Sequence, residues 1–261
     1  MTPVWLLPPT DLQLFNHDVH LWRAQLELSE LLIQKLATTL SEDEHQRAER
    51  FYFERDRKHF IAGRGLLRQI LGRYLGMNPR QVEFCYGKRG KPALKETCGG
   101  KRLRFNVSHS HGLILYAITQ DQRIGVDLEY LRPMPDAEQL AQRFFSPQEY
   151  AVICSVSEEQ KHKAFFQGWT SKEAYLKAIG EGLAGLEQVE VSVNPAEPTA
   201  LLSINKDPQA VYRWSIAGLT PVPGYFASLV VERKDWQLSC FDYTEKSVSG
   251  WGVGGSGVGG N

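Results

Sequence analysis

Apolar positions along the chain separate two long helical stretches from a series of short strands. Over residues 42–76, aromatic and aliphatic residues recur among arginines at helical spacing, and Gly76 supplies a stop signal. A second helical span is predicted from residue 135 to residue 180. Apolar runs bounded by turn residues predict strands over residues 82–86, 103–108, 113–118, 124–129, 189–193, 212–217 and 226–231.

The order of these elements indicates two halves, the second of which repeats the first loosely. Arg50-Phe51-Tyr52-Phe53 in the first helical stretch is similar to Arg143-Phe144-Phe145 in the second, and such a likeness hints at an internal repeat. Residues 247–261 are dominated by Gly and Ser, so we expect a disordered tail without a function.

Composition is typical of a globular protein and narrows the classes of partner. The chain has 261 residues, of which 42% are hydrophobic and 23% charged, enough for one large or two small domains. Lys plus Arg and Asp plus Glu each number 30, so no overall positive charge favours nucleic acid as a partner. A polyanionic ligand would have to bind to local clusters of lysine and arginine.

Cysteines and hydropathy indicate a cytoplasmic protein. Cys85, Cys98, Cys154 and Cys240 are scattered without paired or metal-finger spacing, which predicts free thiols in a reducing compartment. The apolar start, 4–7, lacks a basic leader and is broken by prolines. Because no run reaches the ~18 apolar residues of a membrane span, we expect no membrane partner.

Carboxylates in two segments predict a divalent-metal site. On a strand over 124–129, Asp127 and Glu129 share one face, and on a helix Glu173 and Lys177 lie one turn apart. Taken singly, such pairs are usually solvated surface. Together the three carboxylates suit Mg²⁺ or Mn²⁺, with a phosphate ester or anhydride as substrate. A His109-x-His111 pair lacks a third ligand at suitable spacing, so zinc is disfavoured.

Further short motifs follow one another along residues 40–230. In chain order they are Gly90-Lys91-Pro92, Phe105-Asn106-Val107-Ser108-His109-Ser110, Gly125-Val126-Asp127-Leu128-Glu129, the segment 143–150, the segment 169–177, and Gly180-Glu181-Gly182-Leu183. This series resembles the 4′-phosphopantetheinyl transferases of the long, surfactin-synthetase-activating (Sfp-like) type.

The resemblance implies an α+β fold, a pseudo-dimer of two similar halves. Each half would pack a small antiparallel sheet on a long helix, with the active site between the halves. We place the halves at residues 1–121 and 122–246, the tail following at 247–261. Because one chain supplies both halves, we expect a monomer.

The resemblance also implies the reaction. The family moves the phosphopantetheine arm of coenzyme A, the co-substrate, onto a serine of an apo acyl, peptidyl or polyketide carrier protein and releases adenosine 3′,5′-bisphosphate. Such proteins serve fatty acid, polyketide or nonribosomal peptide biosynthesis, and the sequence leaves the carrier open. Two rival functions remain: a Mg²⁺-dependent phosphodiesterase acting on coenzyme A or a nucleotide, and a non-catalytic module that docks carriers.

Site residues follow from the matching motifs. Asp127, Glu129 and Glu173 are the expected Mg²⁺ ligands, and Glu173, Lys177 and Asp127 the expected catalytic residues, with Glu173 the first choice of general base. The residues expected to bind coenzyme A are Arg47, Arg64, Gly90, Lys91, Pro92, Ser108, His109, Lys172 and Lys177. Glu44 departs from the pattern, since some relatives carry lysine there. For Lys58, a phosphate contact and a solvated helix face are equally favoured.

Overall fold

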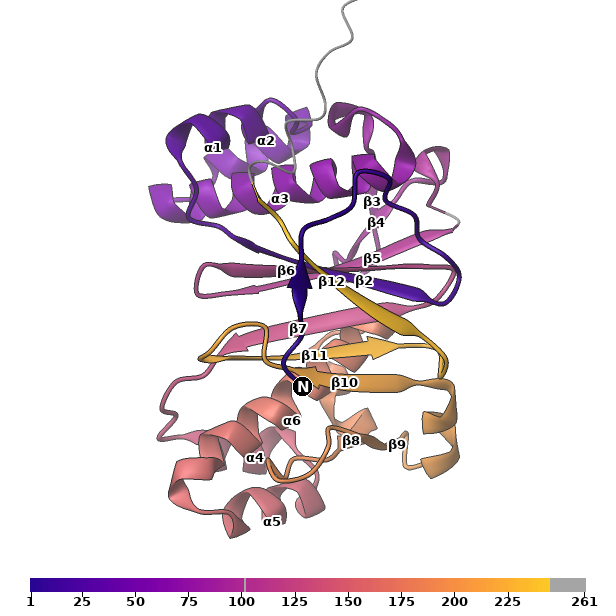
Figure 1. Cartoon of the computed structure of the whole chain (residues 1–261). Helices are drawn as coiled ribbons and strands as arrows, with labels where there is room; N and C mark the ends of the chain where they lie inside the picture. The colour runs from indigo at the N-terminus through magenta and orange to yellow at the C-terminus, as the bar shows by residue number, and fades with distance from the viewer. Residues whose placement is uncertain (101, 245–261) are drawn as a thin grey trace, which may run out of the picture.

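Two helices of equal length organise the molecule, whose computed structural model describes residues 1–100 and 102–244 (Figure 1). Helices α3 (Glu54–Leu75) and α6 (Glu158–Ile179) each contain 22 residues and end at a glycine in the left-handed conformation, Gly76 and Gly180. The N–H of each glycine donates to the carbonyl four residues earlier, Gly72 O or Leu176 O, and the lack of a Cβ allows this conformation without a clash. The predicted tail, 247–261, lies outside the described residues.

The first half is a five-stranded sheet covered by α3 and two shorter helices, α1 (Glu30–Ala37) and α2 (Glu42–Glu49). Its strands follow the order β1-β12-β2-β6-β5. They are β1 (Trp5–Leu6), β2 (Asp18–Gln25), β5 (Leu103–Ser110), β6 (Leu113–Gln120) and β12 (Gln237–Asp242). Apolar residues of α3, such as Leu66 and Ile70, pack on Trp22 and Phe105 of this sheet.

The second half packs α6 on a three-stranded antiparallel sheet of order β10-β11-β7. Its strands are β7 (Ile124–Tyr130), β10 (Ser215–Leu219) and β11 (Tyr225–Val231). Helices α4 (Ala137–Phe144) and α5 (Pro147–Ser155) lie beside α6. Two small hairpins complete the strands, formed by β3 (Phe84–Tyr86) with β4 (Pro92–Leu94) and by β8 (Val189–Val191) with β9 (Leu201–Ile204).

The two sheets pack against each other through a dry apolar layer. Leu21 and Leu115 of the first sheet belong to the same buried cluster as Val126 and Leu229 of the second. The layer order, helices on sheet on sheet on helices, is visible in Figure 1. The predicted α+β fold class, with a long helix on a sheet in each half, is confirmed.

Several boundaries differ from those predicted. The helical stretch 42–76 is broken at residues 50–53, and the span 135–180 is three helices. A serine precedes each of the helices α2 and α5 as its N-cap. Ser41 and Ser146 form capping boxes with the glutamates three residues later, Glu44 and Glu149.

Elements β2, α1 and β12 were not predicted. Strand β12, which we assigned to the second half, pairs in parallel with β2, so the first sheet is mixed. The division after residue 121 therefore does not separate the sheets.

An internal repeat relates the halves through these glutamates. Glu44 Oε2 lies 2.7 Å from Arg68 Nε on α3, and Glu149 Oε2 lies 2.8 Å from Lys172 Nζ on α6. All four side chains are buried. The aromatic segments that suggested the repeat do not correspond, because Arg50–Phe53 leads into the long helix and Arg143–Phe145 leads into α5.

Candidate active site

Alternate side chains of β5 join the two sheets. Asn106, Ser108 and Ser110 point to the side of β7, where they accept hydrogen bonds from the backbone N–H groups of Val126, Leu128 and Tyr130 at 2.8, 3.1 and 3.2 Å. Strands have a period of two, so residues 107 and 109 face the opposite side, toward α3. The Asn-x-Ser-x-Ser pattern is thus the seam between the halves.

Asp127 and Lys177 meet beside this seam. Lys177 Nζ on α6 lies 2.6 Å from Asp127 Oδ1 and 3.0 Å from Ser108 Oγ. Ser108 Oγ donates to Asp127 Oδ1 at 3.0 Å while accepting from Lys177 and Leu128, so this hydroxyl has no capacity left. Helix α6 comes this close because β7 carries Gly125: an added Cβ would lie 1.9 Å from the carbonyl oxygen of Ala174.

Two further carboxylates, those of Glu129 and Glu173, lie close to this ion pair. Burial first, and then repulsion by Asp127, raises the pKa of Glu173 above its ordinary value. The same two causes raise the pKa of Glu129, although Ser110 Oγ donates to Glu129 Oε2 at 3.1 Å. Asp127 Oδ2 and Glu173 Oε1 are buried, and neither has a hydrogen-bond partner within residues 1–100 and 102–244. Buried, mutually repelling oxygens without donors are suited to a hard divalent cation.

The carboxylates are not arranged as a closed ligand cage. No group of three or more His, Cys, Asp or Glu side chains in the described part of the chain has metal-site geometry by itself. Lys177 instead neutralises Asp127. A cation here would rely on two or three protein oxygens and on oxygens from the substrate, which is the usual situation for Mg²⁺.

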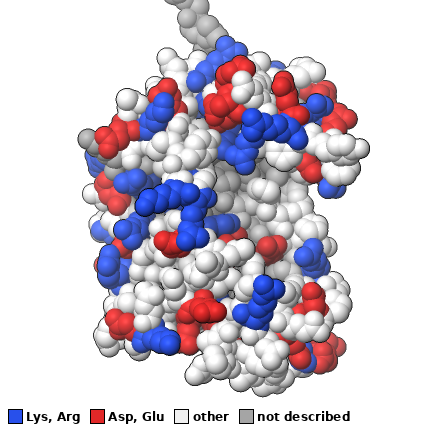
Figure 2. All heavy atoms as spheres, turned by 180° about the vertical axis from the view of Figure 1, so that it is seen from behind, with Lys and Arg blue, Asp and Glu red and all other residues white. Residues whose placement is uncertain are grey.

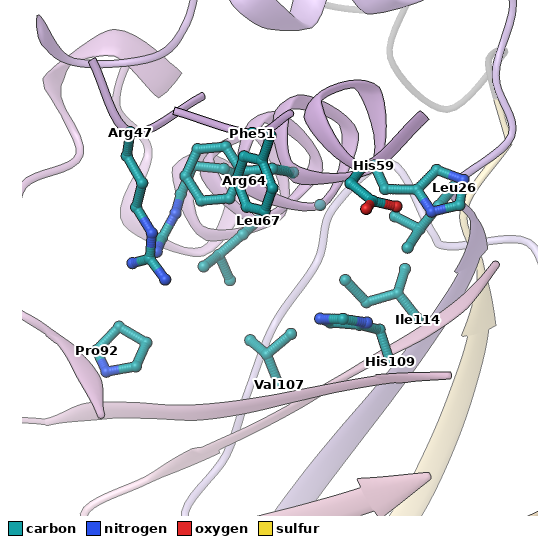
Figure 3. A pocket seen from close by; sticks show the side chains of 13 residues that line it. Leu26, Arg47, Phe51, His59, Arg64, Leu67, Pro92, Val107, His109 and Ile114 are labelled. Carbon is teal, nitrogen blue, oxygen red and sulfur yellow. The ribbon is translucent and has the colours of Figure 1, made fainter. Parts of the chain in front are cut away.

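A cavity of about 350 Å³ lies on the other side of β5, beneath α3 (Figure 3). Arg47, Arg64 and Pro92 lie toward one end of it, and His59 and His109 lie toward the other. Arg64 Nη1 and His59 Nε2 are buried without a partner among the described residues. Burial, followed by the charges of Lys177 and His59, lowers the pKa of His109. The cavity thus offers an anion the unused N–H of Arg64 and, in the tautomer that carries its proton on Nε2, that of His59.

Comparisons with known proteins decide the family. Residues 22–120 match the family model described as 4′-phosphopantetheinyl transferase, N-terminal, and residues 123–237 match that of the 4′-phosphopantetheinyl transferase superfamily. The chain is 48% identical to the 4′-phosphopantetheinyl transferase HetI of Nostoc sp. (strain PCC 7120) over 92% of this chain and 98% of the relative. The chain belongs to the 4′-phosphopantetheinyl transferases.

Two further relatives agree with this assignment. The putative 4′-phosphopantetheinyl transferase slr0495 of Synechocystis sp. (strain PCC 6803) is 40% identical over 64% of this chain and 68% of its own length. The 4′-phosphopantetheinyl transferase Sfp of Bacillus subtilis (strain 168) is 27% identical over 58% of this chain and 65% of its own length. As predicted, this transferase moves the phosphopantetheine arm of coenzyme A onto a serine of an apo carrier protein; nothing favours the phosphodiesterase alternative.

The transferase carries a second cavity, of about 650 Å³, between the β3–β4 hairpin and the end of α6. Basic residues line it, but acidic partners engage several of them. Arg89 lies 2.9 Å from Glu181, and Arg123 lies 3.5 Å from Glu232. Figure 2 shows lysine and arginine side chains beside a hollow on the rear face, about halfway between the upper and lower helices. We attach no ligand to the second cavity, because two of its five basic residues pair with acids and a third, Lys91, donates to backbone carbonyls.

Gly90-Lys91-Pro92 forms the tip of that hairpin. Gly90 has φ 77°, which only glycine adopts without strain, and its N–H closes a turn by donating to Gly87 O at 2.9 Å. Pro92 lines the first cavity. The ammonium of Lys91 instead donates to backbone carbonyls of the second half. Burial, and then the nearby cations Arg104, Arg123 and Lys177, lowers the pKa of Lys91 to about 8.

Lys172 does not lie where a coenzyme A contact requires. Its side chain is 1% exposed, and Nζ donates to Leu186 O at 3.0 Å and to Val189 O while pairing with Glu149. The helix turns this residue into the core of the second half, away from the seam. We therefore correct the prediction: Lys172 is a core cation, and only Lys177 of the two lysines reaches the site.

Glu44 and Lys58 also have structural partners. Glu44 caps α2 and pairs with Arg68, which explains an acidic residue at this position. Lys58 Nζ lies 2.7 Å from Glu30 and 2.9 Å from Glu54, so it joins α3 to α1 on the surface. The sequence reading missed His59. Nothing in the local sequence around His59 indicates a ligand site, because the cavity that it faces forms only where α3 packs on the sheet.

Across the described residues, no helix is both long and apolar enough to span a membrane.

Proposed function

We propose that Asp127, Glu129 and Glu173 hold a Mg²⁺ ion between the two halves. The observation that carries this proposal is the pair of buried carboxylate oxygens without partners, Asp127 Oδ2 and Glu173 Oε1, among three repelling acids. When bound, the ion would neutralise the pyrophosphate of coenzyme A and polarise the phosphorus that bears pantetheine.

Glu173 is the proposed general base. Its carboxylate lies beside Asp127 and Lys177, where the two halves meet, so it can accept the proton of a serine brought to this site. The Oγ of the carrier serine forms a bond to the phosphorus that bears pantetheine, and its proton passes to Glu173. The bond from that phosphorus to the bridging oxygen breaks, and the electron pair leaves with adenosine 3′,5′-bisphosphate. Lys177, already oriented by Asp127 and Ser108, would donate to the bridging oxygen as negative charge develops there.

The cavity beneath α3 is the proposed binding site for the nucleotide end of coenzyme A. Arg47 supplies positive charge, and His109 supplies an imidazole from the strand that also carries Ser108. Arg64 Nε lies 3.3 Å from Glu44 Oε1, but its Nη1 has no partner among the described residues and can donate to a phosphate oxygen. Gly90 and Pro92 would shape the mouth of the cavity. His59, which faces the same cavity with an unpartnered Nε2, would add a donor to the 3′-phosphate.

The carrier class is left open among acyl, peptidyl and polyketide carrier proteins. A cytoplasmic location and a monomeric state stay predictions, consistent with free cysteines and with both halves being present in one chain. Mn²⁺ could replace Mg²⁺ because both accept oxygen donors.

The direct test weighs apo carrier proteins from each class by intact-protein mass spectrometry after incubation with coenzyme A and Mg²⁺. We expect a gain equal to one phosphopantetheine with wild type, lost in EDTA and in Glu173→Ala. Glu159→Ala is the matched control, since Glu159 lies on the exposed first turn of the same helix. Transfer by Glu173→Ala at the wild-type rate would contradict the assigned base and ligand.

A further inference from the structure

Lys91 links the β3–β4 hairpin of the first half to the second half. Its Nζ donates to Ile124 O at 3.3 Å, to Ala178 O at 3.2 Å and to Lys177 O. The first of these carbonyls begins β7, and the other two belong to the last turn of α6. An ammonium has three N–H donors, so these contacts use all of them.

These backbone acceptors fit a structural role for the Lys91 ammonium better than a role in binding phosphate. The last carbonyls of a helix lack intrahelical donors and carry partial negative charge, which a lysine can satisfy. The charged neighbours of Lys91 are Arg104, Arg123 and Lys177, all of them basic. Since its donors are occupied and its side chain points into the end of α6, Lys91 has nothing free to offer coenzyme A.

One of the acceptors is the backbone of a site residue. Lys177 O receives Lys91, while the side chain of Lys177 reaches Asp127 and Ser108. Lys177 lies two residues before the end of α6, in a turn that frays easily when its carbonyls are not capped. The backbone of this turn decides where the ammonium of Lys177 lies.

We propose that Lys91 is a positioning residue: it fixes the last turn of α6 against the hairpin so that Lys177 stays on Asp127. This inference rests on the proposed role of Lys177 in the transfer. It assigns to the lysine of Gly90-Lys91-Pro92 a task across the two halves, in place of the predicted contact with coenzyme A.

Steady-state kinetics of Lys91→Met separate the two roles. Methionine keeps the length of the side chain but removes every donor. A positioning role predicts a loss in kcat of about tenfold or more, because small misplacements of a catalytic group are costly, with KM for coenzyme A changed less than about twofold. A raised KM at unchanged kcat would overturn the proposal in favour of ligand contact. Lys88→Met, an exposed neighbour on the hairpin, is the control.

A double-mutant cycle with Lys177→Ala provides the second readout. If Lys91 acts through Lys177, then adding Lys91→Met to Lys177→Ala lowers kcat by less than about twofold further. Losses that multiply, or a Lys177→Ala variant as active as wild type, would overturn the proposal. Wild-type transfer to a carrier is measured in the same series, so failure of the proposed function is seen separately. Lys91→Gln, which retains an amide donor, replaces methionine if the first variant does not fold.

Discussion

Arg68 and Lys172 occupy the same position in two helices of equal length. Each lies eight residues before the left-handed glycine that ends its helix, and each pairs with the glutamate of a capping box. Arg68 also donates to Val82 O at 2.7 Å, and Lys172 donates to Val189 O. In both halves the cation therefore ties the long helix to the preceding helix and to the segment that follows.

The Lys172–Glu149 pair should be needed for stability and not for binding coenzyme A. Lys172→Met leaves the buried carboxylate of Glu149 without its cation, which we expect to lower the free energy of unfolding by about 3–5 kcal/mol. Replacing both residues, as Lys172→Met with Glu149→Gln, should restore much of that loss because no buried charge is left unpaired. Urea denaturation measures both.

The same variants test the corrected role of Lys172. The folded fraction of each variant should have the wild-type KM for coenzyme A, because the side chain of Lys172 lies in the core of the second half. A tenfold higher KM in the stable double variant would return Lys172 to the binding site.

His59 should contribute to recognition of the 3′-phosphate. Removing one hydrogen bond to a charged phosphate loses about 1.5–3 kcal/mol, so His59→Ala should raise KM for coenzyme A about tenfold or more. With dephospho-coenzyme A, which lacks that phosphate, the variant and wild type should have similar KM values. His162→Ala serves as the control histidine. Equal losses with both substrates would mean that His59 only shapes the cavity.

Local periodicity alone was enough to bring together several residues of the candidate site. The face shared by Asp127 and Glu129 follows from a strand, and Glu173 above Lys177 follows from a helix turn. The resemblance of the motifs to those of the transferase family supplied the other predicted site residues and the fold class. These inferences needed no knowledge of which elements pack together.

What the sequence could not supply depends on contacts between distant segments. Lys172 and Lys177 look alike on a helix, and only the packing of α5 shows that Lys172 faces Glu149. The sequence predicts that Ser108 contacts coenzyme A, whereas in the structure its hydroxyl is bonded to Asp127 and Leu128 of β7. Strand β12 returns to β2 across more than two hundred residues, which no local pattern records.

Glu173 should destabilise the protein when no cation is bound. Burial and repulsion by Asp127 raise its pKa above the ordinary value of 4.5. At neutral pH, where the carboxylate of the unfolded chain is charged, this shift costs the folded state free energy. Glu173→Gln should therefore raise the unfolding temperature in EDTA by a few degrees. Added Mg²⁺ should stabilise wild type more than this variant. A lower unfolding temperature for Glu173→Gln in EDTA would contradict the repulsion that we infer.

His20 should make stability fall as the pH drops from neutral. Its ring is 4% exposed, and Nδ1 lies 2.8 Å from Tyr74 Oη, which also accepts from Trp22 Nε1 at 2.8 Å. Tyr74 has one hydroxyl proton, which we assign to His20 Nδ1. Protonated His20 would instead need an acceptor there, and the hydroxyl would face two donors. Burial accordingly lowers the pKa of His20 from 6.5 to about 4, despite Asp18 nearby.

The lowered pKa of His20 sets the pH range in which the free energy of unfolding falls. Above pH 6.5 His20 is neutral in both states and its full contribution to stability is present. Between pH 6.5 and about 4 the unfolded chain binds the extra proton, so the free energy of unfolding falls, by up to about 3 kcal/mol. Urea denaturation at pH 7, 5.5 and 4.5 measures this loss against His20→Phe, which cannot take up the proton and should lose less. His17→Gln, at an exposed histidine, should behave as wild type, and an unchanged slope in His20→Phe would assign the acid sensitivity to other groups.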